Sequence, residues 1–218
     1  MAGKTGLYVL RHTHDPSEML PGKIETYPWG CAYRPETVFR AGWTENGIRV
    51  LMECREADPL RRVNTKDNPP AVLYIRVKQP NGNVWCDSCM EFFVAPGETA
   101  ADGYFNFEMN ANGALLLGWG VSDTEFVLSD FPREKIALRA EVYADRWALD
   151  LIVPFALFRR HMPGFVPTPG KILHGNFYKC GDETASPHFG CYFPIDPASV
   201  PTPCFHVPEY YGKLLLEE

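Results

Sequence analysis

An alternating stretch near the middle of the chain limits the possible folds most strongly. From Tyr104 to Asn110 the sequence reads YFNFEMN, so large apolar and polar residues take turns. Side chains of a β-strand point to opposite faces in turn, and this segment therefore predicts a strand with Phe105, Phe107 and Met109 on one face. The other face carries the remaining residues: Tyr104, Asn106, Glu108 and Asn110. A face of this kind indicates a sheet that holds a polar, flat-ringed ligand.

Short strands separated by Gly, Pro and Asn turns extend along the rest of the chain. A hairpin is predicted where Val38–Trp43 and Ile48–Cys54 flank Glu45-Asn46-Gly47. The other predicted strands are Leu7–Arg11 (at a sheet edge), Ala71–Lys78, Trp85–Val94, Tyr104–Asn110, Ala114–Trp119, Ile136–Tyr143, Trp147–Val153, Lys171–Lys179, Phe189–Ile195 and Lys213–Glu217. Asp58–Pro70 predicts a loop, Glu125–Glu134 is ambiguous, and only Pro154–His161 resembles a helical turn.

These elements predict an all-β fold, a two-sheet antiparallel β-sandwich of the jelly-roll or immunoglobulin-like kind. Neither a repeat nor a shift in composition divides the chain, so we expect a single domain over residues 1–218. Twenty prolines suit long ordered loops at the ends of the sheets.

Charge and cysteine content narrow the classes of partner. The formal net charge is −6 and no basic cluster stands out, which argues against nucleic acid and against an anionic membrane as partners. Seven cysteines, an odd number, favour reduced and mostly buried thiols. The first residues, MAGKTGLYVLRHTHDP, do not read as a secretory signal. The expected location is therefore the cytoplasm, or the extracellular space if a leader has been removed.

Trp85 and Glu91 lie an even number of residues apart, so a regular strand would place them on one face. Sugars are bound by an aromatic ring stacked on the sugar ring and by polar side chains that grip its hydroxyls. Trp85, Glu91 and the polar face around Glu108 supply both, provided that the two strands are neighbours. Six residues of regular strand span roughly 20 Å, so a bend near Cys86–Ser88 is needed to bring Trp85 back toward Glu91.

A second polar group follows in Asn176–Asp182 and at His188, in a sequence rich in Gly and Pro. Lys179 and Asp182 could contact a ligand, or they could tie a structural loop together by hydrogen bonds. Asp182 with Glu183 could instead help to bind calcium, which prefers oxygen ligands. Cys86-Asp-Ser-Cys89 has the form of half a zinc site, but no second pair has the required spacing.

Four separated segments resemble the carbohydrate-binding module family 9-like domains, relatives of cellulose- and xylan-binding modules. The segments are DSCMEFFVAP, YFNFEMNANG, NFYKCGDETASPHF and FHVPEYYGKLLLE, and the resemblance covers Pro28 to Glu217. It implies a β-sandwich that binds an oligosaccharide or polysaccharide, and it implies secretion in many relatives.

The resemblance also implies roles for residues. In the family two tryptophans sandwich a sugar at the reducing end of a chain, and the first lies six residues before a ligand-binding glutamate. Trp85 and Glu91 have this spacing. A basic contact residue of the family is replaced here by Glu108, and Tyr192 is the candidate for the second ring.

These observations predict a non-catalytic protein that binds the ends of cello- or xylo-oligosaccharides, with no cofactor. The candidate ligand-binding residues are Trp85, Glu91, Asn106, Glu108, Asn110, Asn176, Lys179 and Tyr192. One alternative is a glycan-active hydrolase that uses Glu91 and Glu108 as its two carboxyl groups. Another is an intracellular sandwich protein that has lost sugar binding, with the polar strand face simply solvated.

Overall fold

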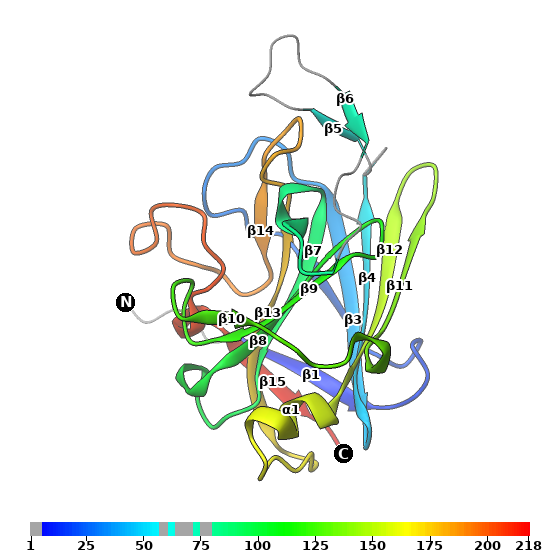
Figure 1. The fold of residues 1–218 in the computed structure, drawn as a ribbon, viewed down its shortest axis with the longest axis vertical. Coiled ribbons are helices and arrows are strands. Elements are labelled where there is room, and N and C mark those ends of the chain that lie inside the picture. The colour runs from blue at the N-terminus through cyan, green and yellow to red at the C-terminus, as the bar shows by residue number, and fades with distance from the viewer. Residues whose placement is uncertain (1–5, 57–60, 64–71, 75–79) are drawn as a thin grey trace.

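The structure is a computed structural model that describes residues 6–56, 61–63, 72–74 and 80–218 of the 218-residue chain. Strands dominate the described part, as Figure 1 shows. They are β1 (Leu7–His12), β2 (Pro21–Ile24), β3 (Glu36–Thr44), β4 (Gly47–Arg55), β5 (Arg61–Val63), β6 (Val72–Tyr74), β7 (Cys89–Ala95), β8 (Tyr104–Asn110), β9 (Leu115–Gly120), β10 (Phe126–Leu128), β11 (Ala137–Val142), β12 (Trp147–Pro154), β13 (Ile172–Cys180), β14 (Phe189–Cys191) and β15 (Gly212–Leu216). The helical elements are the 3-10 turns η1 (Val84–Cys86), η2 (Ala100–Asp102), η3 (Arg133–Lys135) and η4 (Pro208–Tyr210) and the α-helix α1 (Phe155–His161).

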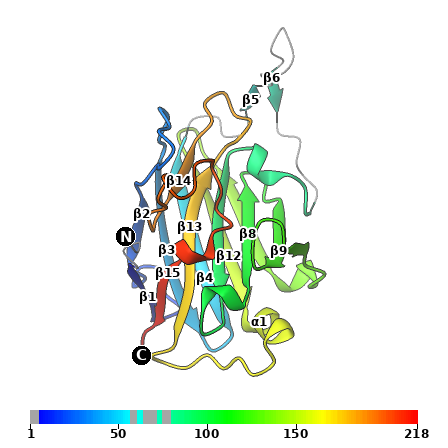
Figure 2. The same ribbon diagram turned by 90° about the vertical axis from the view of Figure 1, so that its left-hand side faces the viewer.

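The strands form two sheets that one shared strand joins. The first sheet has the order β10-β9-β8-β7-β13-β15, with β14 beside β13. The second has the order β3-β4-β12-β11, with β2 beside β3. The first part of β1 pairs with β15 and its last residues pair with β3, so β1 passes from one sheet to the other (Figures 1 and 2). The predicted all-β fold is confirmed.

Two details of that prediction are wrong. Both pairings of β1 are parallel, so the sheets are mixed rather than purely antiparallel. The same strand is interior and not at an edge, because β15 covers one side of it. Parallel pairing needs a long connection between partners, and β15 satisfies this because it comes from the far end of the chain.

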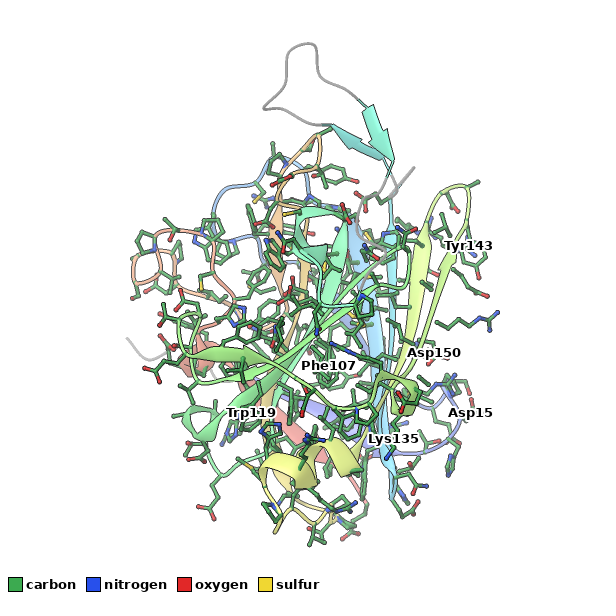
Figure 3. All side chains as sticks on the ribbon, viewed as in Figure 1. Asp15, Phe107, Trp119, Lys135, Tyr143 and Asp150 are labelled. Atoms are coloured by element: carbon green, nitrogen blue, oxygen red, sulfur yellow. The ribbon has the colours of Figure 1, made fainter. Side chains whose placement is uncertain are left out.

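A large apolar core fills the space between the sheets. Phe105, Phe107 and Met109 of β8 point into it, as their alternation predicts. Phe107 lies in the middle of the molecule, whereas Asp150 of β12 and Tyr143 lie toward its edge (Figure 3). Burying each large apolar side chain contributes about 1.5–3 kcal/mol, which makes this core the main source of stability.

The outer face of the first sheet is also covered, which the sequence does not predict. A second apolar cluster there includes Phe93, Tyr104 and Tyr178 from the strands together with Val84 of η1 and Phe205 from a loop. Every residue of β7 and β8 is buried as a result. A solvated polar face on β8 is therefore excluded.

Most predicted strands are confirmed, and the exceptions have local causes. The hairpin of β3 and β4 forms around the predicted turn, and β8 has its predicted bounds. The strand predicted from Trp85 instead begins at Cys89, because residues 84–86 form η1. β2 is missed, and the ambiguous segment Glu125–Glu134 contains β10 and the start of η3.

The segment between β4 and η1 is described only in part. β5 pairs with β6 in a separate two-stranded sheet, so the loop predicted over Asp58–Pro70 is wrong where β5 lies. Val72–Tyr74 belongs to the strand predicted over Ala71–Lys78. The other residues of both predicted segments lie outside the described residues.

The seven cysteines all lie within the described residues and form no disulfide, as the sequence predicts. Within the described ranges, the helices are too short and too polar for any of them to span a bilayer.

Candidate functional site

A cavity of about 450 Å³ lies on the outer face of the first sheet. Its floor is formed by Glu91 of β7, Glu108 of β8 and Cys180 of β13. Aromatic side chains from the surrounding loops and short strands form much of its wall, namely Trp85, Phe126, Phe189 and Phe205. Acidic groups at the bottom and rings at the side give this cavity the two kinds of contact that a sugar ring needs.

Glu91 and Glu108 lie directly opposite each other, because β7 and β8 pair antiparallel in that register. Both are buried, with exposed fractions of 2% and 4%. The thiol of Cys180 donates to Glu91 Oε1 at 3.0 Å, and the Asn106 amide donates to Glu108 Oε1 at 2.7 Å. Glu108 Oε2 is buried without a hydrogen-bond partner. The pair therefore keeps acceptor capacity that the protein does not use.

Burial, together with nearby acids, makes both carboxyl groups weaker acids than usual. Burial, and then the facing Glu108, hold the pKa of Glu91 well above its ordinary value. Burial raises the pKa of Glu108 to about 7, although the hydrogen bond from Asn106 acts in the opposite direction. Two like charges that face each other in a buried site disfavour full ionisation of both groups. The floor of the cavity thus accepts donors readily and would be stabilised by a positive charge.

The η1 turn brings Trp85 to the cavity. The amide of Asp87 donates to the carbonyl of Val84 at 3.0 Å, which closes the turn. The carbonyl of Trp85 accepts from the amide of Asp182 at 3.1 Å, so the loop after β13 holds the turn in place. The structure thereby contains the bend near Cys86–Ser88 that the sequence requires, and Trp85 and Glu91 line the same cavity.

His206 closes the cavity next to Glu108. Its Nδ1 lies 2.8 Å from the Tyr104 hydroxyl, and its Nε2 lies 3.9 Å from Glu108 Oε1. Burial lowers the pKa of His206 to about 4, so its ring is neutral at neutral pH. Its ring also packs against Phe93, at 5.0 Å between centroids. The sequence gives no role to His206, although it belongs to the FHVPEYYG segment.

Five of the predicted ligand-binding residues do not line this cavity. Asn106 lies beside it and acts only through its hydrogen bond to Glu108. Asn110 accepts from the amides of Asn112 and Ala114 and thereby builds its own turn. The Asn176 amide donates to the Phe193 carbonyl at 3.0 Å, and its oxygen accepts from the Phe193 amide at 2.9 Å. Both side chains serve the backbone of neighbouring segments.

Lys179 lies in the interior of the sandwich, and the half-buried Tyr192 packs against the core. Tyr192 packs with its ring edge against Phe39, at 4.9 Å between centroids. Lys179 is fully buried on the opposite face of β13 from Cys180. Neither position matches the predicted contact with ligand in this cavity.

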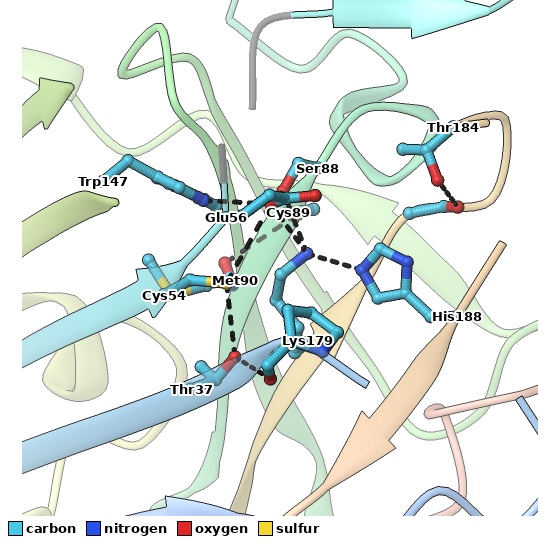
Figure 4. A network of polar contacts seen from close by, with 12 residues as sticks. Thr37, Cys54, Glu56, Ser88, Cys89, Met90, Trp147, Lys179, Thr184 and His188 are labelled. Carbon is cyan, nitrogen blue, oxygen red and sulfur yellow. Dashed lines mark hydrogen bonds and ion pairs between the residues drawn. The ribbon is translucent and has the colours of Figure 1, made fainter. Parts of the chain in front are cut away.

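Figure 4 shows the cluster around Lys179. Its Nζ donates to Ser88 Oγ at 2.9 Å and to His188 Nε2 at 2.7 Å, and it lies 3.7 Å from Glu56 Oε2. Ser88 Oγ and Trp147 Nε1 also donate to Glu56. We call these five residues the interior ionic cluster. From the sequence, Lys179 could either contact a ligand or tie a structural loop together, and this closed network matches the second alternative.

One group of side chains among the described residues has the spacing of metal ligands: Cys89, Glu91 and Cys180, with ligand atoms within 4.8 Å of one another. Two thiols favour zinc or copper over calcium, which prefers oxygen. Asp182 and Glu183, the calcium ligands considered from the sequence, do not belong to this group. The Cys180 thiol already donates to Glu91, which satisfies part of this group without a metal.

Comparison with known proteins places the chain in a family. The sequence model of carbohydrate-binding family 9 matches residues 18–216. A putative carbohydrate-binding protein from Bacteroides uniformis ATCC 8492 is 25% identical, with a TM-score of 0.75 over 98% of this chain and 99% of that one. No curated protein matches the chain.

Two further solved structures share the fold at 10% identity. Both are a carbohydrate-binding module of family 9 from Caldicellulosiruptor kristjanssonii. The complex with cellotriose has a TM-score of 0.64 over 97% of this chain and 94% of that one. The complex with glucose has a TM-score of 0.63 over 96% and 95%. With the family match spanning nearly its whole length, the chain belongs to carbohydrate-binding family 9.

Proposed function

We propose that the cavity on the first sheet binds the end of a cello- or xylo-oligosaccharide without cleaving it. Trp85 stacks on a sugar ring, and the acceptors of Glu91 and Glu108 take hydrogen bonds from its hydroxyls. The observation that carries this proposal is the convergence of one indole and two buried carboxyl groups on a single cavity. Complexes of the Caldicellulosiruptor module with cellotriose and with glucose support the class of ligand.

Two physical effects favour the binding of a sugar in this cavity. The flat face of a tryptophan covers apolar C–H groups of a pyranose and removes them from water. Glu108 Oε2 is already desolvated and has no partner, so a ligand hydroxyl that reaches it gains a hydrogen bond at little further cost. Cavity walls of Phe126, Phe189 and Phe205 exclude water from that contact.

Calorimetric titration with glucose, cellotriose and xylobiose tests the proposal. We expect heat of binding with at least one of them and a loss of about tenfold in affinity for Trp85→Ala, since about 1.4 kcal/mol is a factor of ten. Tyr143→Ala is the matched control, because this exposed tyrosine lies outside the cavity. An absence of heat with every sugar, or equal affinity in the Trp85 variant and wild type, would contradict the proposal.

A hydrolase is the second candidate, and the carboxyl pair favours it. Glu91 and Glu108 face each other across neighbouring strands, and a carboxyl with a pKa of about 7 suits a general acid. Release of a chromophore from aryl β-glycosides, abolished by Glu91→Gln, is the result that this candidate requires. Stable binding of cellotriose without release of glucose would rule it out in favour of binding alone.

A further inference from the structure

The ionisable side chains that line the cavity are mostly acidic, as far as the described residues show. Among its described lining residues are the facing acids Glu91 and Glu108 and the acid Asp123, and neither lysine nor arginine. Its one histidine, His206, is neutral at neutral pH because burial lowers its pKa to about 4. A cavity with this lining favours a ligand that brings a positive charge.

The deepest acid also has an unused oxygen. Glu108 Oε2 is buried and has no hydrogen-bond partner, while Oε1 accepts from Asn106. Removing one oxygen of a carboxylate from water without a partner costs free energy. An ammonium group repays this cost better than a hydroxyl, because its hydrogen bond to a carboxylate is charge-assisted.

The aromatic wall adds a second attraction for a cation. Trp85, Phe126, Phe189 and Phe205 surround the acids, and ring faces attract a nearby positive charge. A neutral sugar gains the stacking alone, whereas a cationic sugar gains the stacking and the interaction with the ring electrons. The acids and the aromatic rings of the lining therefore both favour a cationic sugar over a neutral one.

The fold treats Glu56, another buried acid, differently. Glu56 has Lys179 within 3.7 Å, so a residue of the chain itself supplies the positive charge in the interior ionic cluster. None of the described residues that line the cavity is a lysine or arginine that could play this part for the facing pair of Glu91 and Glu108. A positively charged ligand would take the place that Lys179 takes beside Glu56.

We propose that the preferred ligand is an amino sugar, with its ring on Trp85 and its protonated amine against Glu108. The inference rests on the proposed function, because it assigns the ligand class of the same cavity. A soft metal ion at Cys89, Glu91 and Cys180 would also supply positive charge. The aromatic wall favours the organic cation, since a metal ion would make no use of it.

Three disaccharides with the same β-1,4-linked backbone provide a matched test: cellobiose, the glucosamine dimer and its N-acetylated form. They differ at carbon 2, which bears a hydroxyl, an ammonium group or a neutral amide. In calorimetry at about pH 7 with a chelator present, we expect the glucosamine dimer to bind at least tenfold more tightly than either of the others. The preference should shrink as salt is added, because the contact involves charge.

Glu108→Gln should reduce the ratio of affinities for the glucosamine dimer and cellobiose toward one. Trp85→Ala should weaken the binding of all three disaccharides. Glu125→Gln, an exposed acid outside the cavity lining, is the control and should leave the preference intact. Thermal melts check that each variant folds, and Glu91→Gln replaces Glu108→Gln if the latter does not.

The outcomes separate this inference from the proposed function. Equal or tighter binding of cellobiose would overturn the amino sugar and leave the proposed function standing. A preference that survives in both glutamine variants would place the amine elsewhere and would also overturn it. Failure of every sugar to bind would overturn both, and zinc binding in a separate titration without chelator would then assign the cavity to a metal instead.

Discussion

The interior ionic cluster and the outer cavity lie on opposite faces of the first sheet, and both bury ionisable side chains. In the interior ionic cluster Lys179 faces Glu56, and Ser88, His188 and Trp147 complete the hydrogen bonds. In the cavity two glutamates face each other, and Glu108 Oε2 has no partner. The first arrangement is complete within the chain, whereas the second leaves one buried carboxyl oxygen without a partner.

This difference separates stability from binding. A closed network of buried charges holds loops in place and is costly to break, but it has nothing to offer a ligand. A cavity with unsatisfied acceptors costs the fold stability and gives that free energy back when a donor arrives. Substitutions in the interior ionic cluster should therefore lower the unfolding free energy, whereas substitutions in the cavity should lower the affinity for ligand.

The largest effect is expected for Lys179→Met. Removing Lys179 leaves the buried Glu56 without its cation, which costs about 3–5 kcal/mol of unfolding free energy. Urea denaturation measures this cost, and Glu56→Gln in the same chain should restore part of it. A variant as stable as wild type would show that the cluster does not hold the fold.

Glu108→Gln should act in the opposite direction on stability. The pKa of this carboxyl rises from 4.5 to about 7 on folding, so the folded state keeps a proton that the unfolded state loses. Stability from this residue therefore falls as pH rises from about 4.5 to about 7, and the glutamine variant avoids the loss. We expect the variant to gain on the order of 3 kcal/mol relative to wild type across this window.

Urea denaturation of wild type and the Glu108→Gln variant at several pH values measures the difference between their unfolding free energies. Groups that titrate in both proteins contribute equally and cancel in this difference. Glu53→Gln provides a control at a less buried acid of the second sheet. A difference in unfolding free energy that stays constant with pH would contradict the raised pKa of Glu108.

Asn176→Ala should lower stability and spare binding. The variant loses the hydrogen bonds between Asn176 and the backbone of Phe193, at a cost of about 2 kcal/mol. Cellotriose affinity should remain that of wild type, because Asn176 does not line the cavity. Weaker binding at unchanged stability would return Asn176 to the ligand-binding set.

Local alternation explains which parts of the fold follow from the sequence. β8 has its predicted bounds because seven residues alternate without interruption. The same rule places Lys179 with Phe177 on the core face of β13. The sequence does not reveal this, because Lys179 is a polar residue in a segment rich in glycine and proline. Alternation also places Glu91 and Glu108 on one face, although it says nothing of how deeply they are buried.

Long-range contacts explain what could not be predicted. Phe205 and His206 reach the cavity from an irregular segment without periodicity, so no local signal places them over β7 and β8. Trp85 lies in the cavity because η1 interrupts the expected strand, and a loop some hundred residues later holds that turn. Tyr192, the candidate for the second ring, is half-buried and packs against the core instead.

Two tryptophans report on the two regions directly. Trp85 lines the cavity, and the indole of Trp147 donates to Glu56 in the interior ionic cluster at 3.2 Å. The chain has five tryptophans, so their indole N–H signals can be assigned one by one in a ¹⁵N-labelled sample by substitution. Titration with cellotriose should shift the Trp85 signal and leave that of Trp147 in place. A shift of Trp147 alone, or of neither at saturating sugar, would contradict the assignment of binding to the open cavity.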